Sequence, residues 1–563
     1  MRARLRTSCL AASILIGAQS AAPALAAAPA AMTPTGAVSA ESGGVRSDFN
    51  GDGYSDLAIG STGGPDRRFL DTDGEGRVHV LYGSRSGLTA AGDQLWTQES
   101  DGIADTKFGP FSEDESGDDF GSELATGDFD DDGFGDLAIG APGEHPLQDP
   151  RPHALGAVHI LYGSPNGLKG TNEIRWPAKV GIADDAIQFG TALAGGDLDG
   201  DGIDDLAVVT AWSTDFNTTP EDKIAVAILR GSQDGLRKVA STIWYEPGIS
   251  VYGAQLASGD LDGDGIDDVA LGIPGATREL WSSGHVRVLF GDAEEVGARN
   301  VLLTQDTDGM ARFPGDADGA AEYEFFGAGL AIGDFDADGR DDLAIGTPGE
   351  GLPDAPCFDD SGFPRCPGIV TIVPGTADGL DLASSVVLAQ GSDGMAGSSE
   401  RGDRFGEVLA TGDLNRDGWM DLAIGAPGET IDNLCPEESD DYETNGMCGN
   451  GAVTVVSGSA NGLVPSVSSR WTLVTPGVPG RLTEFGYEGF GSTLAIASFG
   501  RGRAADLAIG VPAGGGHYYG HVDVLYGTTS GLSAEHAQLW SPNSAGVKGS
   551  SVALNFFGLA LGQ

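Results

Sequence analysis

The chain has 563 residues, of which 91 are glycine and 28 are proline, and 40% of the residues are hydrophobic. This is enough apolar material for a core, but the glycine excess favours many turns over long helices. The formal net charge of −52 disfavours nucleic acid and bare anionic membranes as partners, because both are recognised through basic surfaces.

The N-terminus has the pattern of a secretory signal. Arginines near the start precede an apolar stretch from about Leu10 to Ala18, and Ala24-Leu25-Ala26 supplies a cleavage site. We therefore expect residues 1–27 to be a signal peptide cleaved near Ala26, and residues 28–45, rich in Ala, Pro, Thr and Ser, to be a flexible linker. No later segment is apolar for about 18 residues or more, so we expect a secreted protein with no transmembrane segment.

Residues 46–563 contain six copies of an acidic motif, D-x-[DN]-x-D-G-x-x-D. Oxygen-bearing side chains stand at positions 1, 3, 5 and 9, and the glycine at position 6 permits a sharp turn, as in the calcium loop of an EF-hand. The alternate spacing lets short side chains converge on one hard cation, and a backbone carbonyl at position 7 can add a ligand. Each loop runs into a short β-prone segment such as LAIG, so the setting is not that of an EF-hand.

The predicted ligands at positions 1, 3, 5, 7 and 9 of the six loops are Asp48, Asn50, Asp52, Tyr54 and Asp56; Asp128, Asp130, Asp132, Phe134 and Asp136; Asp197, Asp199, Asp201, Ile203 and Asp205; Asp260, Asp262, Asp264, Ile266 and Asp268; Asp334, Asp336, Asp338, Arg340 and Asp342; and Asp413, Asn415, Asp417, Trp419 and Asp421.

The segments around the loops repeat as well. An aromatic–Gly segment, predicted to be a strand, precedes most loops, and a continuous apolar run such as LAIG follows each loop. Next comes an alternating segment such as VHVLYG, predicted to be a half-buried strand, then a turn that in most units ends in Gly-Leu, and an outer segment that often carries tryptophan. The alternating strand occurs seven times, beginning at Val78, Val158, Val226, Val286, Val370, Val453 and Val522. Four short strands per unit and seven units predict an all-β, seven-bladed β-propeller.

The two ends of the repeated region are complementary. The first unit has its acidic loop at Asp48 but no aromatic–Gly segment before it, and the chain finishes with such a segment, Phe557–Gln563, that has no loop after it. We expect the N-terminal and C-terminal segments to pair within one blade, which would close the ring and remove the exposed edges of an open array.

At these residues the chain resembles the FG-GAP repeat family, in its exported bacterial form, whose propeller is also found in integrin α subunits. The resemblance is carried by Phe120-Gly121 ahead of Gly140-Ala141-Pro142, and by Phe405-Gly406 ahead of Gly425-Ala426-Pro427, and it covers about residues 46–563. It implies Ca²⁺ in the acidic loops on one face, about six structural sites here, and partner docking on the opposite face. The seventh loop, Ser498 to Asp506, keeps only the last carboxylate and contains arginines, so we expect no calcium there.

The cysteines favour disulfide bonds. Removal of the signal peptide leaves Cys357, Cys366, Cys435 and Cys448, and an even count in an exported chain favours two bridges. The spacing suggests Cys357–Cys366 and Cys435–Cys448, although other pairings remain open. Zinc is disfavoured because no CxxC pair or accompanying histidine is present. Variable connections follow the GAP position at 61–76, 143–156, 350–368 and 429–450, and the last two of them hold the cysteine pairs.

The sequence contains no G-x-S-x-G nucleophile elbow and no H-E-x-x-H zinc motif, so we assign no catalytic residue. A carboxylate pair for glycoside hydrolysis stays open, because Asp and Glu are abundant. Arg401-Gly402-Asp403 matches a tripeptide that some integrins bind, and we interpret it as coincidence. We expect a monomeric, non-catalytic adhesion or ligand-binding module for an extracellular protein or glycan, with long loops as its binding face. The alternative is a secreted hydrolase directed at phospholipid or glycan.

Overall fold

The computed structural model describes residues 46–61, 76–103, 118–145, 154–182, 186–211, 223–247, 253–275, 283–313, 324–353, 357, 366–431, 449–483, 488–514, 519–549 and 556–562. All of them belong to one compact unit, Thr33–Gln563. The predicted signal peptide and linker lie outside the described residues. Among the helices of the described part, none is long and apolar enough to cross a membrane.

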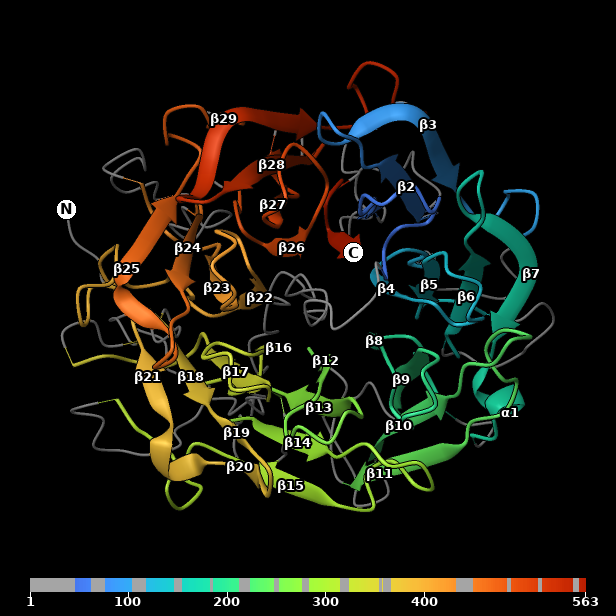
Figure 1. The fold of residues 1–563 in the computed structure, drawn as a ribbon, viewed down its shortest axis with the longest axis horizontal. Coiled ribbons are helices and arrows are strands. Elements are labelled where there is room, and N and C mark those ends of the chain that lie inside the picture. The colour runs from blue at the N-terminus through green and yellow to red at the C-terminus, as the bar shows by residue number, and fades with distance from the viewer. Residues whose placement is uncertain are drawn as a thin grey trace, which may run out of the picture. The chain divides into compact units, whose positions relative to one another are not determined.

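The unit is a seven-bladed β-propeller, and each blade is a four-stranded antiparallel sheet (Figure 1). From the inner to the outer strand, blade 1 contains β30 (Ala560–Gly562), β1 (Leu57–Ser61), β2 (Arg77–Tyr82) and β3 (Thr89–Trp96). Blade 2 contains β4 (Glu123–Gly127), β5 (Asp136–Ala141), β6 (Ala157–Tyr162) and β7 (Lys169–Arg175). Blade 3 contains β8 (Leu193–Gly196), β9 (Asp205–Ala211), β10 (Lys223–Leu229) and β11 (Thr242–Pro247). Blade 4 contains β12 (Gln255–Gly259), β13 (Asp268–Ile273), β14 (His285–Leu289) and β15 (Asn300–Leu303).

Blade 5 contains β16 (Gly329–Gly333), β17 (Asp342–Thr347), β18 (Ile369–Val373) and β21 (Val386–Leu388). Blade 6 contains β22 (Val408–Gly412), β23 (Asp421–Ala426), β24 (Ala452–Ser457) and β25 (Val464–Trp471). Blade 7 contains β26 (Thr493–Ala497), β27 (Asp506–Val511), β28 (His521–Thr528) and β29 (Gly531–Trp540). Blade 5 also carries a small hairpin, β19 (Gly375–Thr376) and β20 (Gly379–Leu380), and the described helices are α1 (Pro177–Val180) and a 3₁₀ turn at Leu382–Ser384.

The ring closes through both ends of the chain, as predicted. β30 pairs antiparallel with β1, with Ile59 opposite Leu561, and becomes the innermost strand of blade 1. It also contacts β4 of blade 2 and β26 of blade 7, so the inner strands form an unbroken circle. In Figure 1 the red C-terminal segment lies beside the blue N-terminal blade.

The aromatic–Gly pairs are turns that anchor one blade to the previous one, not strands as the sequence suggested. Gly406 has φ +88°, which strand backbone does not adopt, and β22 begins at Val408. The Phe405 side chain is fully buried, and its N–H donates to the carbonyl of Pro367 in blade 5 at 2.7 Å. The second strand of blade 5 passes so close that a Cβ added at Gly346 would lie 1.8 Å from the Gly406 carbonyl oxygen. The repeated Phe-Gly and Gly-Ala-Pro elements are therefore two sides of one blade-to-blade contact.

The core lies between the blades, where each apolar cluster combines residues of two neighbours. Phe120 and Leu124 of blade 2 pack with Val78 and Val80 of blade 1, for example. The LAIG strands are buried along their whole length, as expected for strands covered on both faces. The prediction that the VHVLYG strands are half-buried is wrong for β2 and β6, because neighbouring blades cover both of their faces.

Two polar side chains of these third strands are consequently trapped in the core. His79 and His159 are 2% and 0% exposed, and each makes an edge-on ring contact of 5.2 Å, with Phe557 and Phe120 respectively. Burial lowers the pKa of His79 to about 4 and that of His159 to about 3, because the protonated ring would lose its hydration. Both imidazoles are therefore neutral at pH 7.

Removal of the closing strand is expected to destabilise the whole propeller. Deletion of residues 557–563 leaves β1 with an unpaired edge and removes the buried Phe557 and Leu561. The truncated protein should unfold at a markedly lower temperature than the full-length protein in a calorimetric scan. An unchanged unfolding temperature would contradict closure through β30.

The buried histidines are expected to make the fold sensitive to acid. A base whose folded-state pKa lies below its unfolded value of about 6.5 contributes stability that is present above pH 6.5 and is lost as the pH falls toward the folded pKa. For each histidine that stays neutral in the folded state, the unfolding free energy should fall by up to about 1.4 kcal/mol per pH unit of acidification in this window. Urea unfolding of the wild type between pH 7 and pH 4 should show this loss, and His159→Leu should show a shallower dependence. Equal slopes for the two proteins would contradict the assignment.

Candidate metal centre

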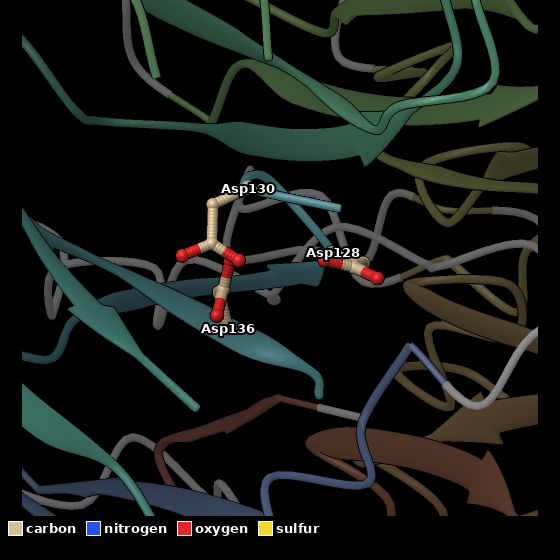
Figure 2. Close-up of side chains that lie close together, drawn as sticks. All are labelled: Asp128, Asp130 and Asp136. Carbon is tan, nitrogen blue, oxygen red and sulfur yellow. The ribbon is translucent and has the colours of Figure 1, made fainter. Parts of the chain in front are cut away.

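The acidic loops connect the first and second strands of each blade, and four of the six gather three carboxylates. In the second loop, Asp128, Asp130 and Asp136 place one oxygen each within 4.8 Å of the others (Figure 2). The same holds for Asp197, Asp199 and Asp201, for Asp260, Asp262 and Asp268, and for Asp334, Asp336 and Asp338. Two oxygens on opposite sides of a Ca²⁺ ion, each about 2.4 Å away, are about 4.8 Å apart. The spacing of these clusters therefore fits a hard divalent cation.

The loop backbone holds this geometry through the first and third carboxylates. Both oxygens of Asp128 accept backbone N–H groups, from Asp132 at 3.1 Å and from Gly133 at 3.0 Å, and Asp132 accepts from Phe134 at 3.1 Å. Gly133 has φ +86°, which permits the turn. Oδ1 of Asp130, by contrast, is buried without a hydrogen-bond partner, so it stays available to a cation. An unpaired buried carboxylate oxygen is costly, and a cation would satisfy it.

Crowding and burial oppose ionisation of these side chains when no cation is bound. Burial raises the pKa of Asp130 to about 6, and the charges of Asp132 and Asp128 add to this effect. Burial likewise raises the pKa of Asp136 to about 9, against the hydrogen bonds that favour its charged form. A bound cation would reverse this balance by supplying the missing positive charge.

The carboxylate at position 9 has a structural role that sequence reasoning missed. Asp136 is fully buried and accepts from the N–H of Phe129 in its own loop and from the N–H of Gly163 after the third strand, both at 2.8 Å. Asp506 does the same in the seventh loop, accepting from Gly500 at 3.1 Å and Gly527 at 2.9 Å. This residue therefore ties two turns of one blade together even where the other ligand positions are lost. The retention of Asp506 in a loop that has lost its other ligands is the sequence feature that indicates this structural role.

The remaining predicted ligand sets are unequal. In the first and sixth loops, where asparagine holds position 3, the described residues form no group of three carboxylates. Asn415 uses its amide nitrogen to donate to Asp421 at 3.3 Å. In the seventh loop the described residues likewise gather no such group, and Arg501 lies over the Tyr526 ring at 5.0 Å.

Arginines lie against three of the acidic clusters. Arg230 contacts Asp199 at 2.8 Å, Arg299 contacts Asp262, and Arg340 contacts Asp338 at 2.7 Å. Arg340 was predicted to contribute only its backbone carbonyl. The other two arginines come from the end of the third strand and the start of the fourth, far from the loops in sequence. These guanidinium groups offset part of the negative charge in the third, fourth and fifth loops.

Backbone hydrogen bonds link each acidic loop to the next around the ring. In all seven junctions the N–H at position 8 of one loop donates to the carbonyl at position 1 of the preceding loop, over 2.8 to 3.2 Å. The pairs are Gly135 to Asp48, Asp204 to Asp128, Asp267 to Asp197, Asp341 to Asp260, Met420 to Asp334, Ala505 to Asp413 and Ser55 to Ser498.

Three of these junctions are reinforced by an aspartate at position 8. The carboxylates of Asp204, Asp267 and Asp341 accept the N–H of the first residue in the preceding loop, at 2.8, 3.1 and 3.0 Å. Arg46 bridges two of them, contacting Asp204 at 3.1 Å and Asp267 at 2.8 Å. The doubled Asp at positions 8 and 9 was visible in the sequence, but only its second member had been assigned a role.

Strand order places the other connections at the opposite end of each blade. The acidic loop joins the first strand to the second and the Gly-Leu turn joins the third to the fourth, so in an antiparallel sheet both lie at one end. The connections after the GAP position leave from the other end, where the predicted disulfide Cys357–Cys366 is confirmed. Cys435 and Cys448, with the central parts of the insertions at 61–76, 143–156, 350–368 and 429–450, lie outside the described residues. Asp403 of the Arg-Gly-Asp tripeptide is fully buried, so it is not displayed to a receptor.

The FG-GAP repeat family matches six segments of the chain, residues 39–81, 120–161, 189–221, 252–289, 326–362 and 405–456. The chain is an FG-GAP repeat protein. These segments include the six loops with a complete ligand set and omit the seventh, so the ligand-poor blade lies outside the matched repeats.

The FG-GAP protein shares these repeats with larger proteins. It is 32% identical to integrin alpha-5 of Xenopus laevis over 250 residues, which cover 43% of this chain and 20% of that protein. It is 34% identical to phosphatidylinositol-glycan-specific phospholipase D of Rattus norvegicus over 169 residues, or 30% of this chain and 18% of that protein. The chain thus spans about a fifth or less of the curated relatives it matches. Among solved structures, exotype rhamnogalacturonan lyase YesX is 13% identical with a TM-score of 0.35, over 74% of this chain and 70% of that one.

The position-9 carboxylate gives a prediction that separates structure from metal binding. Asp506→Ala would leave the buried N–H groups of Gly500 and Gly527 without their acceptor. Each unsatisfied buried donor costs about 1–3 kcal/mol, so a loss of roughly 2–6 kcal/mol in unfolding free energy is expected. The loss should be equal in calcium and in chelator, as measured by denaturant unfolding. A loss seen only in calcium would show that the seventh loop binds metal.

Proposed function

We propose that this FG-GAP protein is a secreted, calcium-stabilised propeller that acts as a non-catalytic adhesion or ligand-binding module. The observation that carries the calcium part is the gathering of three carboxylates within 4.8 Å in each of four loops. The loops lie at one end of the blades and are joined to one another through backbone, so cations there would stiffen one face of the ring. The opposite face, with its long connections, is left for a partner.

The expected contribution of calcium is large relative to the stability of a domain. Extracellular modules bind Ca²⁺ with dissociation constants of about 0.1–1 mM. At about 1 mM free Ca²⁺, each such site contributes roughly 0.4–1.4 kcal/mol by mass action. The four clusters together would supply about 2–6 kcal/mol, against a typical total of about 5–15 kcal/mol for a domain. Asn50 and Asn415 leave the first and sixth loops with one carboxylate fewer, so we infer weaker binding there.

Chelation is expected to lower the unfolding temperature, and one loop can be tested in isolation. Asp132→Asn removes a charge at a predicted ligand position of the second loop, whereas Asp131→Asn removes a neighbouring charge that is not at such a position. Asn also suits the positive φ of residue 131. In calorimetry with and without chelator, Asp132→Asn should lose part of the calcium-dependent stabilisation and Asp131→Asn should retain it. Wild-type stability that is unaffected by chelator would refute the calcium proposal.

The binding role has a direct test against its enzymatic alternative. We propose an extracellular protein or glycan as the ligand, supported by the integrin likeness and by the disulfide-tied connection at Cys357–Cys366. The likeness to a phospholipase D supports the alternative of a secreted hydrolase. The full chain, immobilised in calcium, should retain members of a glycan array or proteins of culture medium without altering them. Release of cleaved products from phosphatidylinositol-glycan or from retained glycans would overturn the non-catalytic assignment.

A further inference from the structure

A second acidic cluster lies at the opposite end of the blades from the calcium loops, between blades 5 and 6. Glu400 and Asp403 precede β22, and Glu429 follows β23 in the Pro-Gly-Glu turn. One carboxylate oxygen of each lies within 4.8 Å of the others. Asp403 and Glu429 are 0% and 1% exposed, whereas Glu400 is open to solvent. The cluster is therefore a buried pair with an exposed third member.

The charges in this cluster are only partly balanced. Arg470 of blade 6 contacts Glu429 at 2.6 Å, and Ser398 donates to Glu400 at 2.9 Å. One guanidinium set against three carboxylates leaves two formal negative charges at a site where two of the side chains are withdrawn from water. Burial raises the pKa of Asp403 to about 8, with the charge of Glu429 as the next cause, and burial raises the pKa of Glu429 as well.

Two buried oxygens at the cluster lack hydrogen bonds. Asp403 Oδ2 accepts from the N–H of Glu400 at 2.6 Å, but its Oδ1 is buried without a partner. Gln390, which follows β21 of blade 5 and is 3% exposed, donates its amide nitrogen to Glu429 at 2.7 Å, so its side-chain amide lies at the cluster. The Oε1 of that amide is also buried and unpartnered. Unsatisfied neutral and charged oxygens beside a surplus of negative charge are the ligands that a hard cation prefers.

We propose that Glu400, Asp403 and Glu429 bind a divalent cation of the calcium class, with the amide oxygen of Gln390 as a further ligand. The ion would join blade 5 to blade 6 on the face opposite the calcium loops. The oxygen spacing of at most 4.8 Å matches Ca–O distances of about 2.4 Å, and exposed Glu400 gives the ion an entry path. The site does not depend on the FG-GAP loops or on the proposed ligand-binding role.

A related arrangement elsewhere in the ring supplies the matched control. Gln305 donates to Glu350 at 2.8 Å, as Gln390 does to Glu429, and Glu350 lies in the same Pro-Gly-Glu turn of blade 5. Among the described residues, Glu350 belongs to no group of three carboxylates. Glu350→Gln therefore removes an equivalent buried charge at a position where the described residues form no such group.

The test is a count of bound calcium per chain, by equilibrium dialysis and elemental analysis of the full-length protein. The Glu400→Gln/Asp403→Asn variant should bind one Ca²⁺ fewer than the wild type, and Glu350→Gln should bind the wild-type number. Asp132→Ala should separately lose one ion from the second loop, and its combination with the double variant should lose two. A wild-type count of bound calcium in the folded double variant would overturn the proposal, regardless of how many ions the acidic loops bind.

A single exposed change keeps the proposal testable if the double variant fails to fold. Glu400→Gln alone removes one ligand charge and should weaken one site about tenfold, as expected when the charge count of a calcium site falls. Isothermal titration of the chelated protein with Ca²⁺, repeated with Mg²⁺, would measure this change. Titration curves identical to those of the wild type would refute the site.

Discussion

The propeller depends on a circle of backbone hydrogen bonds that joins each acidic loop to the next. Position 8 of one loop donates to position 1 of its predecessor in all seven blades, including the blade whose ligands are lost. Because both groups are main-chain atoms, the circle survives changes of side chain at these positions: Gly135, Met420, Ala505 and Ser55 serve as well as aspartate. The turns of the loops are therefore set by their neighbours, and a cation would be added to a turn that is already formed.

Main-chain N–H groups in and around the loops explain how so acidic a protein keeps its carboxylates close together. First-position aspartates such as Asp128 bond N–H groups of their own loop, and ninth-position aspartates such as Asp136 bond two turns of their blade, so much of the charge density is fixed by main-chain donors. Arg230 and Arg299 add local counter-charge. The oxygens left over, such as Oδ1 of Asp130, are the ones that a cation would satisfy.

Most of the architecture was predictable because it repeats. Seven alternating strands and a C-terminal Phe-Gly segment without a loop were sufficient to predict the blade number and the closing strand, since both follow from counting units. Properties that arise between units were not predictable. The alternation of VHVLYG indicates an exposed face, but His79 and His159 face a neighbouring blade that the local pattern does not contain. Arg299 approaches Asp262 only because the fourth strand returns over the loop. Arg-Gly-Asp reads as a surface motif, yet the turn before Phe405 directs Asp403 inward.

Closure by β30 has a consequence for how the molecule acquires its fold. β1 lies near the start of the propeller and receives its inner partner from β30, so blade 1 stays incomplete until the other six blades have been synthesised. Contacts so distant in sequence carry a high loop-closure entropy and are formed slowly. During that interval the partial ring presents β1 as an open edge, available to any strand that meets it. The nascent protein is therefore most exposed to mispairing just before β30 becomes available to pair with β1.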